Sequence, residues 1–442
     1  MSQTATEERH APVPSAGGDA SSVHAQVEAL CAQARAAAGE LALAPTAAKD
    51  AALMAVAEAL EASAAEILAA NADDMAAGER AGLSTALLDR LRLDSARLEG
   101  IVAAVRAIVA LGDPVGEVIE GRRLPNGLDL RKVRVPLGVV GVIYEARPNV
   151  TIDTAALCIK SGNAIVLRGS SAAKRSNAVL AQIASAAIAS AGLPVQSITL
   201  LPGESREEIA ALARQSRYLD LIVPRGGEEL KGALQGVATV PVIYAASGNC
   251  HVYVDASADL AQAQRIVMNA KVQRPGVCNA AETLLVHAAI AERFLPAMIA
   301  ELLEAGVQLR ADPRVIALAG EHASSLQSAS AEDWEREYLD LTLAVGIVDS
   351  LEQAIAHINR YGSGHSEAIV TSRGDAARSF QRGVDAACVY VNASTRFTDG
   401  GELGMGAEIG NSTQKLHARG PLGLRELCTY KYLIEGDGHV RA

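Results

Sequence analysis

The sequence has few aromatic residues, few cysteines and none of the usual short motifs for metals or nucleotides. Only 3% of its 442 residues are Phe, Trp or Tyr, although half are hydrophobic. The core must therefore be built mainly from Ala, Val, Leu and Ile. Because single cores rarely serve more than about 250–300 residues, this length predicts two or three domains.

The six cysteines are irregularly spaced, with no C-x-x-C pair and no zinc-ligand spacing. Sparse cysteines in a chain of this length favour a reduced, intracellular protein. The histidines also lack ligand spacing, so we expect no metal site.

Two further absences concern membranes and nucleic acids. No run of about 18 apolar residues is present, and the N-terminus lacks the apolar stretch of a secretory signal. The formal net charge of −11 argues against a nucleic-acid-binding protein, although a single site can still be positive. We therefore expect a cytoplasmic protein that binds neither membranes nor nucleic acid.

In the N-terminal quarter of the chain, composition and apolar spacing predict a tail followed by helices. Residues 1–22 are rich in small residues and Pro without an apolar period, which predicts a disordered tail. Residues 24–111 repeat apolar residues at helical spacing. A β-hairpin is then predicted from 115–119 and 128–135, around the turn at Asn126-Gly127.

From residue 139 onward, predicted strands alternate with predicted helices in two series. Strands are expected at 139–144, 164–168, 197–201, 218–223, 282–287, 342–348, 367–371, 387–392 and 426–434. Helices are expected at 153–161, 173–191, 206–215, 228–235, 259–272, 289–306, 351–360 and 376–384. This alternation is typical of βαβ units on parallel sheets, and it predicts an α/β protein with two such domains.

Cys278 is the only cysteine in a loop suited to chemistry. Pro275 and Gly276 interrupt the preceding helix, and a new element begins just after the cysteine. A cysteine at such a junction can receive backbone N–H groups and become a thiolate nucleophile. The alternative is a small buried residue, the common role of cysteine.

Two segments that follow strands are candidates for binding a nucleotide. The sequence contains neither G-x-G-x-x-G after a strand nor G-x-x-x-x-G-K-[ST]. However, Arg168-Gly169-Ser170 and Arg225-Gly226-Gly227 place small residues and an arginine at strand ends, where dinucleotides bind parallel sheets. Ordinary βα turns with a surface arginine are the alternative.

Six long segments resemble the γ-glutamyl phosphate reductases, a family within the aldehyde dehydrogenase superfamily. The segments lie at 141–151, 160–164, 269–283, 361–366, 391–401 and 414–421, and the likeness spans about residues 25–436. The resemblance implies an aldehyde-dehydrogenase-like fold, with two doubly wound α/β domains and a small β flap for oligomerisation. The implied parts are an NADPH-binding domain (23–114 and 137–272), a catalytic domain (273–410) and the flap (115–136 and 411–442).

The resemblance also implies an activity, the reduction of γ-glutamyl phosphate by NADPH to glutamate 5-semialdehyde and phosphate, the second step of proline biosynthesis. Cys278 would attack the acyl carbon and form a thioester, and Asn149 with the Cys278 N–H would stabilise the oxyanion. A homo-oligomer (dimer or tetramer) and a separate glutamate 5-kinase as supplier of the substrate are expected.

Further residues take roles by the same resemblance. Arg168 would lie near the 2′-phosphate of NADPH, Gly226 and Gly227 near the pyrophosphate, and Glu337 at the nicotinamide ribose. Glu337 could equally be a surface carboxylate. The substrate's carboxylate and phosphate would bind among four unranked basic residues, Arg147, Arg274, Arg396 and Lys415.

Two alternative functions are open. The first is a hydrolytic aldehyde dehydrogenase, which needs a glutamate general base, whereas the comparable segment 244–250 (YAASGNC) has no carboxylate. The segment also departs from the family's usual His-Gly-Asp-Gly-Ile-Cys. The second is an inactive scaffold, against which the presence of Cys278 and Asn149 argues.

Overall fold

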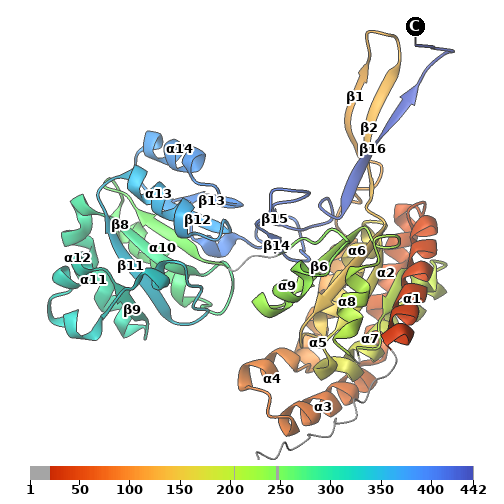
Figure 1. Cartoon of the computed structure of the whole chain (residues 1–442), viewed down its shortest axis with the longest axis horizontal. Coiled ribbons are helices and arrows are strands. Elements are labelled where there is room, and N and C mark those ends of the chain that lie inside the picture. The colour runs from red at the N-terminus through yellow and green to blue at the C-terminus, as the bar shows by residue number, and fades with distance from the viewer. Residues whose placement is uncertain (1–19, 204, 245–247, 442) are drawn as a thin grey trace, which may run out of the picture.

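The computed structural model describes residues 20–203, 205–244 and 248–441. The predicted disordered tail lies outside these residues up to position 19, and positions 20–22 already belong to the first helix. Figure 1 shows two lobes of helices and strands, with a narrow β flap that projects from the lobe containing the N-terminal helices.

Five helices form the first part of the described chain. They are α1 (Ala20–Leu41), α2 (Thr46–Ala62), α3 (Ala64–Arg80), α4 (Thr85–Leu91) and α5 (Ser95–Val109). The helical prediction for 24–111 is therefore confirmed. Apolar stripes on α2 and α5, such as Leu53, Leu60 and Val105, are fully buried because they cover one face of the first sheet.

The first sheet is parallel and has four strands in the order β5-β4-β3-β6. The strands are β3 (Val139–Tyr144), β4 (Ala164–Gly169), β5 (Ile198–Leu200) and β6 (Leu221–Arg225). The connecting helices are α6 (Asn149–Lys160), α7 (Lys174–Ser190), α8 (Glu207–Ala213) and α9 (Glu228–Gln235). Separate apolar clusters cover the two faces, so the sheet is doubly wound. The strand order reverses between β3 and β6, and ligands of such sheets bind at the carboxyl ends of the strands there.

The second sheet is also parallel, with seven strands in the order β10-β9-β11-β8-β7-β12-β13. The strands are β7 (Cys250–Val254), β8 (Ala281–His287), β9 (Gln308–Ala311), β10 (Gln327–Ser328), β11 (Thr342–Val348), β12 (Ser366–Val370) and β13 (Cys388–Val391). The helices are α10 (Leu260–Val272), α11 (Ala288–Glu304), α12 (Pro313–Leu318), α13 (Leu351–Tyr361) and α14 (Gly374–Gly383). Apolar clusters again lie on both faces.

The flap is an antiparallel sheet made from two distant parts of the chain. It consists of β1 (Val118–Arg123), β2 (Asp129–Pro136) and β16 (Cys428–Glu435), with β2 in the centre. Figure 1 shows the orange hairpin and the blue C-terminal strand side by side. A two-stranded pair, β14 (Asn411–Ser412) and β15 (Gly420–Pro421), precedes β16.

The predicted fold class is confirmed, with local corrections. The first hairpin strand was expected at 115–119 but begins at Val118, and α6 begins at Asn149 instead of residue 153. Residues 307–341, for which no helix or strand was expected, contain β9, β10 and α12.

Candidate active site

The Cys278 thiol lies in the loop that joins α10 to the amino end of β8. Among the cysteines of the described ranges, Cys278 is the only one classed as exposed. The helix ends at Val272 because Pro275 and Gly276 follow, and the loop then turns into the buried strand. The exposed thiol can therefore be reached by a substrate, while the buried strand β8 fixes the backbone just after it.

Gly248 packs closely against the backbone of Cys278. A Cβ atom built on Gly248 would lie 1.5 Å from the Cys278 carbonyl oxygen, so no other residue fits there without moving the loop. The Gly248 N–H donates to Oε1 of Glu337 over 2.6 Å. The Cys250 Sγ also donates to the Cys278 carbonyl, over 3.2 Å. Glu337, predicted at the cofactor ribose, therefore lies beside the cysteine loop.

Asn279 ties the same loop to the segment after β13. Its side-chain amide donates to the carbonyl of Thr398 over 2.9 Å, and Thr395 Oγ1 donates to the Asn279 carbonyl over 2.6 Å. The Arg396 guanidinium contacts the Asn279 side-chain oxygen and donates from Nε to Gln273 over 2.8 Å. Arg396 is thus held next to Cys278 by both sides of the loop.

Opposing charges act on the Cys278 thiol. Crowding by protein atoms raises its pKa, and the Arg225 guanidinium lowers it, whereas Glu337 and Glu408 raise it. Arg225 ends β6 of the first sheet, and its Nη1 lies 3.0 Å from the Cβ position of Gly410. The charge that favours the thiolate therefore comes from the other sheet.

Four arginines create a positive region around this junction. Burial lowers the pKa of Arg147, and so do the neighbouring charges of Arg225 and Arg274. Burial and Arg274 likewise lower the pKa of Arg396, whereas Cys278 raises it. Within the described ranges, Arg147, Arg225 and Arg274 have no ion-pair partner. Arginines without an ion-pair partner are suited to bind a phosphate or a carboxylate.

Asn149 is the first residue of α6 and follows Arg147 by two residues. Its side-chain amide donates to Oδ2 of Asp153 over 2.8 Å. Burial raises the pKa of Asp153 to about 6, and Arg225 acts against this rise. No hydrogen bond within the described part of the chain joins Asn149 to Cys278, but Arg225 acts on both Asp153 and Cys278.

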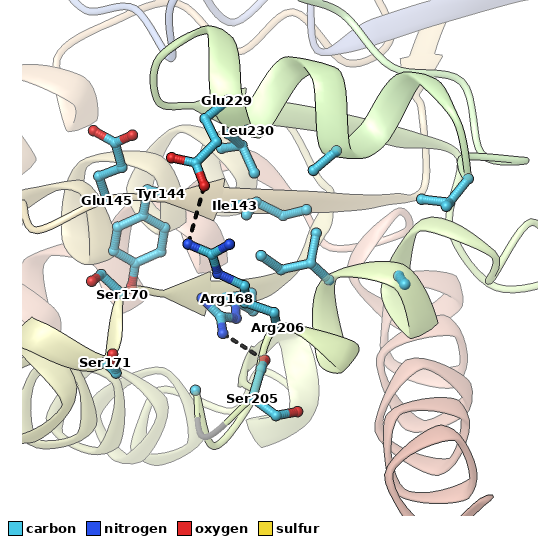
Figure 2. A pocket seen from close by; sticks show the side chains of 15 residues that line it. Ile143, Tyr144, Glu145, Arg168, Ser170, Ser171, Ser205, Arg206, Glu229 and Leu230 are labelled. Carbon is cyan, nitrogen blue, oxygen red and sulfur yellow. Dashed lines mark hydrogen bonds and ion pairs between the residues drawn. The ribbon is translucent and has the colours of Figure 1, made fainter. Parts of the chain in front are cut away.

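A cavity of about 400 Å³ opens at the carboxyl ends of β3 and β4. Figure 2 shows Arg168 and Ser170 among its lining residues, with Arg206 and Glu229 from the α8 and α9 side. Gly169 is tightly enclosed, since a Cβ there would lie 2.1 Å from the Asn177 amide. Arg225 is not among the described residues that line the cavity.

Gly226 and Gly227 lead into α9 beside the cavity. A Cβ on Gly226 would lie 2.8 Å from both Glu145 Oε1 and Leu230, whereas Gly227 faces open space. The Gly227 N–H, at the helix N-terminus, donates to Glu145 Oε1 over 3.1 Å. Small residues at a helix N-terminus are suited to a pyrophosphate, which would have to displace the Glu145 carboxylate from the Gly227 N–H.

Lys415, also predicted to bind the substrate, contacts Asp385 and, among the described residues, none of the neighbours named above for these arginines. It forms an ion pair of 2.6 Å with Asp385, and both side chains are more than half exposed. Arg419 shares the same carboxylate at 2.7 Å.

Sequence reasoning missed several residues of the site. Glu145, Arg206, Glu229 and Gly248 were not proposed, although Glu145 directly follows a buried strand and lies in the segment 141–151 that carries the family resemblance. The others carry no local signal, because their neighbours come from distant elements.

No group of three or more His, Cys, Asp or Glu side chains in the described part of the chain could hold a metal ion. None of its helices is both long enough and apolar enough to span a bilayer.

Comparisons with known proteins agree with these observations. The model of the aldehyde dehydrogenase family matches residues 18–333. A γ-glutamyl phosphate reductase of Thermobifida fusca is 55% identical over 419 residues, covering 95% of this chain and 99% of the relative. One from Kineococcus radiotolerans is 53% identical over 431 residues, covering 98% and 99%.

Solved structures are similar over nearly the whole chain. The crystal structure of a γ-glutamyl phosphate reductase from Thermotoga maritima has a TM-score of 0.92 and 44% identity, covering 94% of this chain and 100% of that one. An acetylating aldehyde dehydrogenase from Geobacillus thermoglucosidasius shares the fold, with a TM-score of 0.66, 18% identity and coverage of 96% and 99%.

Proposed function

The chain belongs to the aldehyde dehydrogenase family and, within it, to the γ-glutamyl phosphate reductases, and we propose from this that it reduces γ-glutamyl phosphate to glutamate 5-semialdehyde. The reaction would release phosphate and use NADPH through a thioester on Cys278. The observation that carries this proposal is an exposed loop cysteine beside arginines that form no ion pair within the described residues.

The first step forms the thioester. The Cys278 thiolate attacks the acyl carbon, the C–O bond to phosphate breaks, and phosphate leaves with the bonding electron pair. Arg147, Arg225, Arg274 and Arg396 would bind the phosphate and the substrate carboxylate, because guanidinium groups pair with both. The oxyanion needs N–H donors, and we propose the Cys278 N–H and the Asn149 amide. The Asn149 amide carries two N–H donors, and its bond to Asp153 uses one of them.

The second step reduces the thioester. NADPH, when bound, supplies a hydride to the thioester carbon. The resulting hemithioacetal oxyanion collapses to the aldehyde, and the C–S bond breaks to regenerate the Cys278 thiolate. The departing phosphate takes up the proton that the overall reaction consumes. No water needs activation, in accord with the lack of a carboxylate in the sequence 244–250.

NADPH is proposed as the cofactor because two arginines, Arg168 and Arg206, line the cavity at the carboxyl ends of β3 and β4. Gly226 and Gly227 would lie at the pyrophosphate, and Glu337 at the nicotinamide ribose, where it could also set the position of Gly248.

We also propose a homo-oligomer that forms through the flap in the cytoplasm. Apolar and aromatic side chains of β1 and β16 are about half exposed, namely Val118, Tyr430, Tyr432 and Ile434. Such a patch on a projecting sheet is typical of a protein interface. A glutamate 5-kinase is the enzyme class that must supply the labile acyl phosphate.

The reverse reaction tests the proposed function, since its substrates are stable enough to mix. Protein, glutamate 5-semialdehyde and NADP⁺ are combined with and without phosphate, and NADPH absorbance is followed. We expect phosphate-dependent NADPH formation that is lost in Cys278→Ala and kept in Cys31→Ala, a buried cysteine of α1. Formation without phosphate would instead indicate a hydrolytic dehydrogenase, and none at all an inactive scaffold.

A further inference from the structure

Two arginines line the cavity, and their surroundings differ. Arg168 comes from the end of β4, and Arg206 directly precedes α8. In Figure 2, dashed lines join Arg168 to Ser205 and Arg206 to Glu229. This difference decides which arginine can accept a new anion.

Arg168 is already bound within the protein. Its Nη2 donates to the Ser205 carbonyl over 2.7 Å, and its Nε lies 3.5 Å from Oε2 of Glu208. The two side chains are 10% and 5% exposed, and burial lowers the pKa of Arg168. Glu208 also accepts from the Gly203 N–H over 3.0 Å. Removing Arg168 from this buried carboxylate would be costly, so its charge is balanced and its contacts fix the cavity wall.

Arg206, unlike Arg168, forms an ion pair that is exposed to solvent. Its Nη2 lies 3.1 Å from Oε1 of Glu229, and the two side chains are 89% and 82% exposed. Exposed ion pairs add little stability. A phosphate dianion, which can accept two parallel N–H bonds from one guanidinium, can therefore displace Glu229 at little cost.

We propose that Arg206 binds the 2′-phosphate of NADPH and that Glu229 is the carboxylate it exchanges for that phosphate. In this arrangement Glu229 serves a second purpose. When the ribose lacks the phosphate, the carboxylate can accept a hydrogen bond from its 2′-hydroxyl, as acidic residues do in NAD sites. The Arg206–Glu229 pair would thus set the preference between the two cofactors. The inference rests on the proposed function, in which the cavity holds the adenosine end of NADPH.

Titration calorimetry with NADP⁺ and with NAD⁺ tests this assignment without any turnover. We expect Arg206→Gln to weaken NADP⁺ binding roughly tenfold to a hundredfold, and to leave NAD⁺ within about threefold. Glu229→Gln should tighten NADP⁺ about twofold to fivefold and weaken NAD⁺ by a similar factor. Arg214→Gln is the matched control, because Arg214 ends the same helix, is exposed and does not line the cavity.

Other results would overturn the proposal. Equal weakening of both nucleotides by Arg206→Gln, or no weakening, would show that Arg206 does not recognise the phosphate. A loss of NADP⁺ preference in Arg168→Gln alone, with an unchanged thermal unfolding midpoint, would assign recognition to Arg168. If the unsubstituted protein bound neither nucleotide, the proposed function would fail instead of the specificity assignment.

Discussion

At the scale of single residues, Cys278 lies among groups that shift its pKa in opposite directions. Arg225 lowers its pKa, while crowding by protein atoms, Glu337 and Glu408 raise it. The pKa of the Cys278 thiol is raised on balance, and a change in any of these charges should change the thiolate fraction.

Replacing Arg225 by Gln should raise the pKa of Cys278. The lost charge favours the thiolate, and one pKa unit corresponds to a tenfold change in the thiolate fraction below the pKa. We expect iodoacetamide alkylation of Cys278 at neutral pH to slow by about threefold to tenfold. Peptide mass spectrometry measures the rate, and Arg214→Gln should leave it unchanged.

Replacing Glu408 by Gln should have the opposite effect. Burial raises the pKa of Glu408 to about 7, with Arg225 acting against the rise. Above pH 7 the carboxylate is charged and raises the pKa of Cys278, so Glu408→Gln should speed alkylation at pH 8 and leave it nearly unchanged at pH 6. Equal acceleration at both pH values would contradict this.

The same carboxyl group affects stability in a definite direction. Because its pKa is raised on folding, folding disfavours the charged form, and stability is lost as pH rises from about 4.5 to 7. Urea unfolding should thus find Glu408→Gln more stable than the unsubstituted protein at pH 8, with the difference shrinking toward pH 5.

Gly248→Ala tests the close approach beneath the cysteine loop. The new methyl group would overlap the Cys278 carbonyl, so the loop must move, at a cost of about 1–3 kcal/mol. We expect activity to fall at least about a hundredfold, since small displacements of reacting groups have such effects. Gly236→Ala, with nothing near its Cβ position, is the control.

At the scale of elements, a buried ion pair joins α10 to β8 on either side of the cysteine loop. Lys271 Nζ lies 2.6 Å from Oε2 of Glu282, and both side chains are fully buried. Glu282 Oε1 also accepts from the Leu339 N–H over 3.2 Å, and burial raises its pKa to about 7. The pair thus fixes three segments that surround the nucleophile.

Lys271→Met should lower the free energy of unfolding by about 3–5 kcal/mol at pH 8, because the buried Glu282 carboxylate loses its counter-ion. Loss of the lysine raises the pKa of Glu282 further. The carboxyl group can then become neutral at lower pH, and the deficit should shrink at pH 6. Urea unfolding at both pH values measures this, and adding Glu282→Leu should recover much of the loss.

The sequence predicted elements well where a local signal exists. Asn126-Gly127 fixes the flap hairpin, and the βαβ alternation fixes both sheets. The start of α6 was missed because Pro148 precedes Asn149, and a proline with φ of −57° already begins the helical course. β9 and β10 were missed because they are short and carry polar residues such as Gln308 and Arg310.

For the site, the sequence could nominate the nucleophile but not its neighbours. Cys278 stands out because of Pro275 and Gly276. Arg225 was expected at the cofactor, yet its place between the sheets depends on how β6 meets the segment around Gly410. Arg206 and Glu229 are ordinary charged residues until the cavity brings them together.

At the scale of the whole molecule, the exposed flap face gives a prediction about assembly. Tyr432→Glu with Ile434→Glu places charges on side chains that are 52% and 55% exposed. We expect sedimentation velocity to show dissociation to the monomer, whereas Leu43→Glu, on an 85% exposed residue between α1 and α2, should not change the assembly. Unchanged sedimentation in the double variant would place the interface elsewhere.

The two neighbours of the central flap strand, β2, are synthesised at very different times. β2 is made early, but its partner β16 is made much later, and Arg131 of β2 contacts Glu435, 304 residues further along the chain. At ribosomal rates of about 5–20 residues per second, one edge of β2 waits about 15 to 60 s for its neighbour. During translation the nascent chain therefore carries an open strand edge until β16 has emerged, and such an edge can pair with another chain.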